Sequence, residues 1–251
     1  MQLRLAVQYD GSGFEGWQLQ PSGATIQGEL ERALTTALRE PVRVRGAGRT
    51  DAGVHASGQV AAVRITQPPP DLDRLRTSLN ALLPETIAVT DITLADDAFD
   101  PRRDARRRCY EYRIWRAPAA SPFWRKYAWH LWGVLDTNAM GVAATLVVGS
   151  HDFRAFRASD ADPVRSTVRQ VLESRLETRG ALLVYRIEAN AFLKHMVRTL
   201  VGTLVEIGRG QRPAASMAAL VDGAARGSAG PTAPPHGLIL KHVRYDDPST
   251  D

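Results

Sequence analysis

The chain has 251 residues, 44% of them hydrophobic, which is enough for one large domain or two ordinary ones with a real core. Its formal net charge of +5 is carried mainly by arginine and favours a nucleic-acid partner, although ordinary surface charge would give the same balance. A single cysteine excludes an internal disulfide, and no apolar run reaches the roughly 18 residues of a membrane span. With no signal or transit peptide pattern and no cluster of metal ligands, we expect a cytoplasmic protein without a metal.

Hydrophobic periodicity divides the first hundred residues into four strands and two helices. Apolar side chains at alternate positions predict strands, and apolar side chains about every fourth position predict amphipathic helices, the first of which Thr25 can cap. The predicted strands are residues 3–10, 42–46, 60–65 and 87–94, and the predicted helices are 25–38 and 71–83. The order β-α-β-β-α-β is that of a ferredoxin-like unit, which RNA-binding domains also use.

The second half has a mixed α/β pattern with long insertions, including a long, ordered loop at residues 118–132. The predicted strands are residues 109–115, 168–178, 182–191 and 238–245, and the predicted helices are 136–148, 195–207 and 214–225. A loop is expected at 160–163 and a polar tail at 246–251. We therefore predict an α+β fold of two ferredoxin- or RRM-like subdomains, 1–104 and 105–251. They would share an extended, mainly antiparallel sheet flanked by helices.

A polar loop with four glycines at residues 46–60 interrupts the strands of the first half, and it holds Arg49, Asp51 and His55. A loop of this kind is a poor core and a good place for a functional site. It lacks the third glycine of a dinucleotide fingerprint and the Lys-Ser/Thr of a P-loop, so we expect no nucleotide cofactor. The spacing alone leaves Asp51 as either a turn cap or a catalytic carboxylate.

Five arginines crowd into seven residues, and like charges at this density repel one another unless an anion is nearby. They can form a solvated linker or a surface that contacts RNA phosphates; we favour the phosphate contact because basic clusters bind nucleic acid by counterion release. The arginines are Arg102, Arg103, Arg106, Arg107 and Arg108.

Two further residues allow both a structural and a functional interpretation. Tyr110 lies with Tyr112 on one face of a predicted strand, where tyrosines are more often core than site. Arg198 falls on an otherwise apolar helix, so it either extends along the surface to reach water or, if buried, needs a partner.

The motifs around these residues resemble those of the tRNA pseudouridine synthase A (TruA-type) family. The segment Gly48-Arg-Thr-Asp-Ala-Gly-Val-His55 is similar to the signature of the family. The other matching segments follow in family order and span nearly the whole chain: 9–18, 25–31, 110–112, 190–202 and 232–238.

The resemblance implies an isomerase that converts uridine to pseudouridine in the tRNA anticodon stem-loop, at positions 38, 39 and 40, without a cofactor. It implies Asp51 as the catalytic residue, Tyr110 against the target base and Arg198 paired with Asp51. Arg49 and His55 would contact RNA or support the loop. The stretch of chain that holds the arginine cluster would run into the second half of the protein and toward the active site. The resemblance also implies a homodimer with tRNA in a basic cleft between its subunits.

Asp51 could add to C6 of uracil, attack C1′ of the ribose or remove the C2′ proton, and the sequence does not choose among these pathways. Three other functions remain open. They are a non-catalytic RNA-binding module of the same fold, a metal-dependent nuclease using Asp51 and a histidine, and a related synthase acting on other RNA sites.

Overall fold

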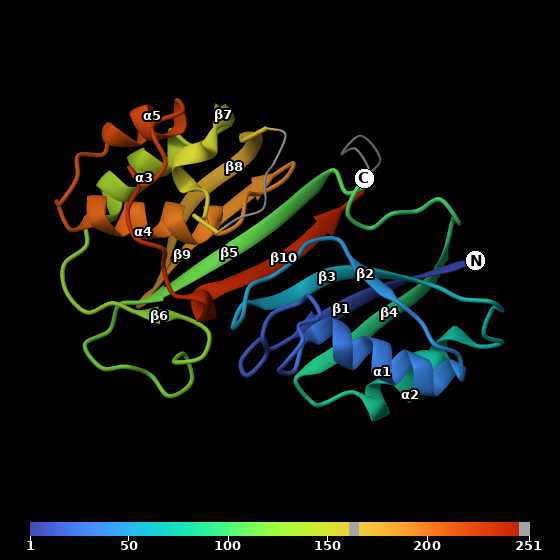
Figure 1. The fold of residues 1–251 in the computed structure, drawn as a ribbon. Helices are drawn as coiled ribbons and strands as arrows, with labels where there is room; N and C mark the ends of the chain where they lie inside the picture. Colours follow the sequence, from blue (N-terminus) through green and yellow to red (C-terminus); the bar gives the residue numbers. More distant parts are fainter. Residues whose placement is uncertain (161–165, 246–251) are drawn as a thin grey trace. The chain divides into compact units, whose positions relative to one another are not determined.

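A computed structural model describes residues 1–160 and 166–245 (Figure 1). The chain divides into two compact units, one of Met1–Arg106 with the segment from Ile239 on, and one of Arg107–Leu238. The sequence predicts subdomains of 1–104 and 105–251. The structure differs in its last strand, which groups with the first unit and not with the second. The predicted loop at 160–163 lies largely outside the described residues, and the predicted tail at 246–251 lies wholly outside them.

The first unit is a mainly antiparallel sheet with two helices packed side by side (Figure 1). Its strands lie in the order β4-β1-β3-β10, with only the β3–β10 pair parallel. Strand β2 pairs antiparallel with β3. The strands are β1 (Gln2–Tyr9), β2 (Val44–Gly46), β3 (His55–Arg64), β4 (Ile87–Ala95) and β10 (Leu238–Arg244), and the helices are α1 (Ile26–Leu38) and α2 (Leu72–Leu82).

The helices of this unit confirm the predictions from hydrophobic periodicity. Thr25 caps α1 by accepting a hydrogen bond from the Gly28 amide (3.2 Å), and Asp71 caps α2 in the same way through Arg74 (2.9 Å). Buried side chains repeat along one face of each helix, while alternate residues of β1 form the core of the sheet. The core residues that carry this pattern are Leu3, Leu5, Val7, Ile26, Leu30, Leu34, Leu75 and Leu79.

Strand β3 is longer than predicted, since it begins at His55 and not at Val60. The prediction of a loop up to residue 60 is therefore wrong for its last part. The polar, glycine-containing start of β3 is extended because its backbone pairs with β10 at His55 and Ala56. A Cβ on Gly58 would lie 2.2 Å from the Lys241 carbonyl oxygen, so glycine allows β10 to approach this closely.

The second unit has a sheet in the order β5-β9-β8-β7, antiparallel throughout, with β6 parallel to β5. Helices α3 and α4 pack on each other, α3 also contacts β8, and α4 also contacts β5. The strands are β5 (Arg107–Trp115), β6 (Trp129–His130), β7 (Gly149–Asp152), β8 (Val168–Arg179) and β9 (Leu182–Ala189). The helices are α3 (Thr137–Thr145), η1 (Phe153–Phe156), α4 (Met196–Gly208), α5 (Ser216–Val221) and η2 (Pro235–Gly237). Helices α3 and α5 are shorter than predicted, and β6 and β7 were not predicted.

Candidate active site

Asp51 lies on a short loop between β2 and β3, residues 47–54, which we call the Asp51 loop. The loop closes with a turn in which the Val54 amide donates to the Asp51 carbonyl oxygen (3.1 Å). Gly53 in this turn has φ +76°, a backbone conformation that glycine adopts without strain. Asp51 is half-buried, so its carboxylate belongs to a folded turn and not to a freely solvated loop.

A chain of buried and partly buried hydrogen bonds joins the Asp51 loop to strands β1 and β3. The Gln59 amide group donates to the Gly48 carbonyl oxygen (2.8 Å) and to the Tyr9 hydroxyl (3.3 Å). The Tyr9 hydroxyl in turn shares a hydrogen bond with the Thr50 hydroxyl (2.8 Å). Burial raises the pKa of Tyr9 to about 12, which keeps the phenol neutral at ordinary pH. These contacts fix the backbone on the N-terminal side of Asp51.

The loop between β1 and α1, residues 10–24, packs directly on the Asp51 loop. The Trp17 amide donates to the Thr50 carbonyl oxygen (3.0 Å), and the Trp17 side chain is buried near Tyr9 (ring centroids 6.1 Å apart). A Cβ on Gly16 would lie 2.6 Å from the Thr50 carbonyl oxygen, and one on Gly46 would lie 2.5 Å from the Trp17 ring. Two motifs far apart in the sequence therefore form one tightly packed structure around Asp51.

His55 is buried, which places it in the support of the loop and not at an exposed RNA contact. Its Nδ1 atom lies 3.0 Å from the Gly11 amide nitrogen and 3.1 Å from a carboxylate oxygen of Asp10. The nitrogen accepts from Gly11 when it is unprotonated and donates to Asp10 when it is protonated. In either state, the ring ties the start of β3 to the start of the 10–24 loop. Arg49, by contrast, is exposed beside Asp51.

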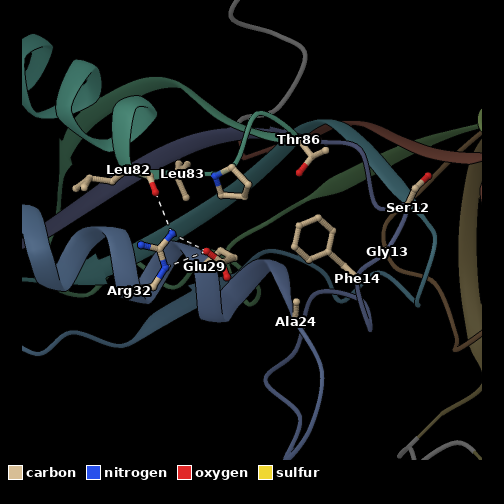
Figure 2. A pocket seen from close by; sticks show the side chains of 10 residues that line it. Ser12, Gly13, Phe14, Ala24, Glu29, Arg32, Leu82, Leu83 and Thr86 are labelled. Carbon is tan, nitrogen blue, oxygen red and sulfur yellow. Dashed lines mark hydrogen bonds and ion pairs between the residues drawn. The ribbon is translucent and has the colours of Figure 1, made fainter.

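The two aromatic residues of the 10–24 loop differ in environment. Trp17 is core, whereas Phe14 is half-buried and lines a shallow pocket of about 490 Å³ (Figure 2). Arg32 on α1 lines the same pocket and donates to a carboxylate oxygen of Glu29 (2.7 Å) and to the Leu82 carbonyl oxygen (2.9 Å). Only Phe14 of the pair therefore has a ring that a ligand could reach.

Tyr110 and Arg198 belong to the second unit. Tyr110 on β5 is buried and packs edge-to-face with Phe192 (ring centroids 5.1 Å apart). Arg198 on α4 is half-buried, and its Nε donates to the Ala233 carbonyl oxygen (2.8 Å). The Ala233 amide donates back to the Arg198 carbonyl oxygen (3.1 Å), which joins the two C-terminal motifs of the chain. Because Asp51 lies in the other unit, its pairing with Arg198 stays a prediction.

A sequence model of a family described as tRNA pseudouridine synthase matches residues 5–102 and 143–246 of this chain. The chain belongs to the tRNA pseudouridine synthase family. Pseudouridine synthases are isomerases, so the protein is an isomerase of this kind.

Curated relatives resemble this synthase over nearly its whole length. A protein named tRNA pseudouridine synthase A from Geotalea uraniireducens is 43% identical, over 97% of this chain and 99% of its own. One of the same name from Myxococcus xanthus is 45% identical, over 98% of this chain and 92% of its own. A solved Cbf5-Nop10-Gar1 complex matches weakly, with a TM-score of 0.39, 10% identity and coverage of 95% of this chain and 48% of that chain.

The arginine cluster of this synthase divides into two parts. Arg102, Arg103 and Arg106 are exposed on a turn at residues 99–106, which we call the arginine turn. One carboxylate oxygen of Asp100 accepts from the amides of Arg102 and Arg103 (2.9 Å each). These backbone hydrogen bonds lower the pKa of Asp100, with a smaller contribution from Arg45.

The base of the arginine turn is fixed by aromatic contacts within the first unit. Phe99 packs on Tyr245 (ring centroids 5.1 Å apart), and the Arg4 guanidinium lies 4.7 Å from the centroid of the Tyr245 ring. The Tyr245 hydroxyl donates to the Pro101 carbonyl oxygen (2.8 Å). The turn is thus an ordered element on which Arg102, Arg103 and Arg106 are exposed.

The other two arginines of the cluster are part of strand β5. Arg107 lies 3.6 Å from a carboxylate oxygen of Glu188 on β9. Arg108 is buried, and its guanidinium donates to the Asn190 carbonyl oxygen (2.8 Å). This position argues against an RNA contact for Arg108. The five arginines therefore differ in environment, since three are exposed on the arginine turn while Arg108 is buried on β5.

Neither unit of the synthase, taken alone, brings three metal-ligating side chains together among its described residues. Within residues 1–160 and 166–245, every helix is too short or too polar to cross a membrane.

Proposed function

We propose that this synthase converts uridine to pseudouridine in the tRNA anticodon stem-loop, at positions 38, 39 and 40, with Asp51 as the catalytic carboxylate. The observation that carries the role of Asp51 is its place on a loop fixed by buried contacts from β1, β3 and the 10–24 loop. A reacting group is effective when its backbone is held in place before the substrate arrives.

The reaction breaks the N1–C1′ bond of uridine and forms a C5–C1′ bond in the same nucleotide. The C5 proton is lost and N1 gains one, so the step is redox-neutral and uses no phosphoryl energy. An ionised Asp51 serves each open pathway: addition to C6, attack on C1′ or removal of the C2′ proton. A base inside a helix must first leave the stack, which costs a few kcal/mol that protein contacts have to offset.

The proposal also assigns roles to Tyr110 and Arg198 of the second unit. Tyr110 would contact the target base, and Arg198 would form an ion pair with Asp51. The mutual hydrogen bonds between Arg198 and Ala233 support this role, because they hold the α4 backbone and guanidinium to the segment before η2. Arg49, which is exposed on the Asp51 loop, would contact RNA, and His55 would support the loop.

We further propose that the arginine turn contacts the phosphates of the tRNA, since three exposed guanidinium groups on a fixed turn form a suitable anion-binding surface. The strand order β4-β1-β3, with β2 also paired to β3, supports a ferredoxin-like first subdomain. A homodimer and a cytoplasmic location remain part of the proposal.

The experiment that tests the function is release of tritium from C5-labelled uridine in tRNA, with and without a chelator. Wild type should release tritium in both conditions. Asp51→Ala should lower the rate at least about 10³-fold, near the upper range for a single acid–base group. Asp91→Ala is the matched control, because Asp91 is an exposed aspartate on β4 of the same unit. Sequencing of the product would then map the modified uridines.

Each rival function predicts a different result in the same assay. A binding module would bind tRNA without releasing tritium. A nuclease would shorten the RNA and stop with chelator. A synthase for other sites would release tritium from another RNA but not from the anticodon stem-loop, and the proposed substrate would then be wrong.

A further inference from the structure

The chain between β5 and α3 exposes large apolar side chains in an unusual concentration. This stretch comprises residues 116–135, and we call it the Phe123 segment. Within it, the side chain of Phe123 is 84% exposed, that of Trp132 64% and that of Val134 93%. Single exposed apolar residues are ordinary, but three of them within 20 residues favour a binding role for this segment.

The exposure of Phe123 is imposed by an ordered loop. The amides of Trp124 and Arg125 donate to the Ser121 carbonyl oxygen (3.2 and 2.9 Å), and those of Tyr127 and Ala128 donate to the Trp124 carbonyl oxygen (2.8 Å each). The Trp124 ring stacks on Trp115 of β5 (ring centroids 6.2 Å apart, planes 23° apart).

Both ends of the segment are tied to β5. The Trp115 indole donates to the Ala119 carbonyl oxygen (2.9 Å), and strand β6 pairs parallel with the end of β5 (Figure 1). The Leu131 amide donates to the Trp115 carbonyl oxygen (2.9 Å). The segment is thus a fixed frame that holds the Phe123 ring in solvent.

The charges of the segment indicate which partner fits. Residues 116–135 contain no aspartate or glutamate, and they contain Arg116, Arg125 and Lys126. Arg125 and Lys126 are exposed and directly follow Phe123 and Trp124 in the sequence. An exposed ring beside cations suits unpaired bases and phosphates, because bases stack on aromatic faces while cations contact the backbone. A purely apolar partner would not account for the cations.

We propose that the Phe123 segment is a second RNA-binding surface, on which an unpaired base of the substrate tRNA stacks on Phe123 and Arg125 contacts a neighbouring phosphate. This inference rests on the proposed function for its ligand. It assigns to the second unit an RNA contact separate in the sequence from the arginine turn and from Tyr110.

The test measures dissociation constants for unmodified tRNA at fixed salt. Phe123→Ala should weaken binding about 5- to 150-fold, the range for loss of one base–aromatic stack. Phe123→Tyr keeps the ring and should bind like wild type, while Phe123→Leu should bind like Phe123→Ala. Val142→Ala is the control, since Val142 on α3 is also exposed (58%) but has no ring and lies outside the segment. Arg125→Gln should reduce the slope of log K against log salt by about one.

The possible outcomes separate this inference from the proposed function. Wild type that binds tRNA and releases tritium, with Phe123→Ala unchanged in affinity, would overturn the inference alone. Normal binding by Phe123→Leu would show an apolar contact and also overturn it. If the partner of the segment were a second copy of the chain, Phe123→Ala would sediment with a lower mass than wild type and would keep its tRNA affinity per subunit. That result would also overturn the inference. Wild type that binds no tRNA would overturn both proposals.

Discussion

The Asp51 loop and the Phe123 segment are both irregular connections, yet they are held in opposite ways. The Asp51 loop is fixed by buried side chains from elsewhere in the sequence, including Tyr9, Trp17 and Gln59. The Phe123 segment is fixed mainly by local turns and by its contacts with the end of β5, while Phe123 and Trp132 face solvent. The first arrangement holds the backbone beside one candidate catalytic residue, and the second leaves two aromatic side chains exposed.

This difference has consequences for mutation. Changes in the 10–24 loop should reach Asp51 through direct packing, so they should lower both stability and turnover. Changes at the exposed rings of the Phe123 segment should lower only RNA affinity, because those rings contribute little to the folded core.

Gly16→Ala should be the most damaging of these changes. Its Cβ would lie 2.6 Å from the Thr50 carbonyl oxygen, and Gly16 has φ +88°, which alanine adopts only with strain. We expect a loss of about 2–5 kcal/mol of unfolding free energy and at least a tenfold loss of turnover. Urea unfolding and tritium release measure the two effects.

Gly13→Ala is the matched control for Gly16→Ala. Gly13 lies in the same loop and has a similar φ of +82°, but no described residue other than its two chain neighbours has an atom within 4 Å of the position of its Cβ. It should therefore show the cost of backbone strain without the clash. Equal losses in the two variants would mean that packing on the Asp51 loop is unimportant.

Tyr9 should make the protein sensitive to alkali. Its pKa is raised from about 10 to about 12, so its stabilising contribution is complete below pH 10 and is lost as pH rises to about 12. The gap corresponds to about 3 kcal/mol. In wild type, the unfolding free energy should therefore fall between pH 10 and 12. In Tyr9→Phe, the share of this fall that comes from Tyr9 should be absent, and denaturation at several pH values would measure the difference. Burial also raises the pKa of Tyr112 and of Tyr185, but these two residues contribute equally in wild type and in Tyr9→Phe. Identical pH profiles would contradict the prediction.

Gln59→Leu should destabilise the support of the Asp51 loop more mildly. The change keeps the approximate size of the side chain but leaves the Gly48 carbonyl oxygen without its hydrogen bond from Gln59. The expected cost is about 1 kcal/mol, the low end of the range for a buried polar group left unpaired, because the bond to Gly48 is only partly buried. Unfolding in urea is the measurement, and Gln67→Leu is the control, since Gln67 is exposed just after β3. A cost no larger than that of the control would show that the bond does not hold the loop.

The sequence predicts local structure well where the pattern is local. The cap at Thr25 and the apolar faces of α1 and α2 follow from residue type and spacing alone. The start of β3 at His55 could not be predicted from local spacing, because it depends on pairing with β10, whose residues lie nearly two hundred positions further along the chain. The buried position of Arg108 did have a signal, since it shares the alternating face of Tyr110 and Tyr112.

The candidate site shows the same limit. Its motif identified Asp51 as a candidate, but the roles of Tyr9, Gln59 and Trp17 as supports depend on contacts that no spacing rule predicts. His55 was expected to contact RNA or to support the loop, and its burial against Gly11 favours support. Phe14 and Trp17 are both aromatic residues of the 10–24 loop, and packing against Gly46 and Tyr9 distinguishes the buried indole.

Arg103→Gln should have the smallest effect and should resemble a change in the Phe123 segment, because the arginine turn is also an exposed surface on a fixed frame. The Arg103 amide still donates to Asp100 in the variant, so the turn and the unfolding free energy should be preserved. Losing one phosphate contact should reduce the slope of log K against log salt by about one, with affinity falling only a few-fold at moderate salt. Arg74→Gln, at an exposed arginine on α2, is the control. An unchanged slope would remove Arg103 from the RNA-binding surface. A loss of unfolding free energy would show that the turn depends on the Arg103 guanidinium. In that case the contacts through Phe99, Asp100 and Tyr245 would not be enough to hold the turn.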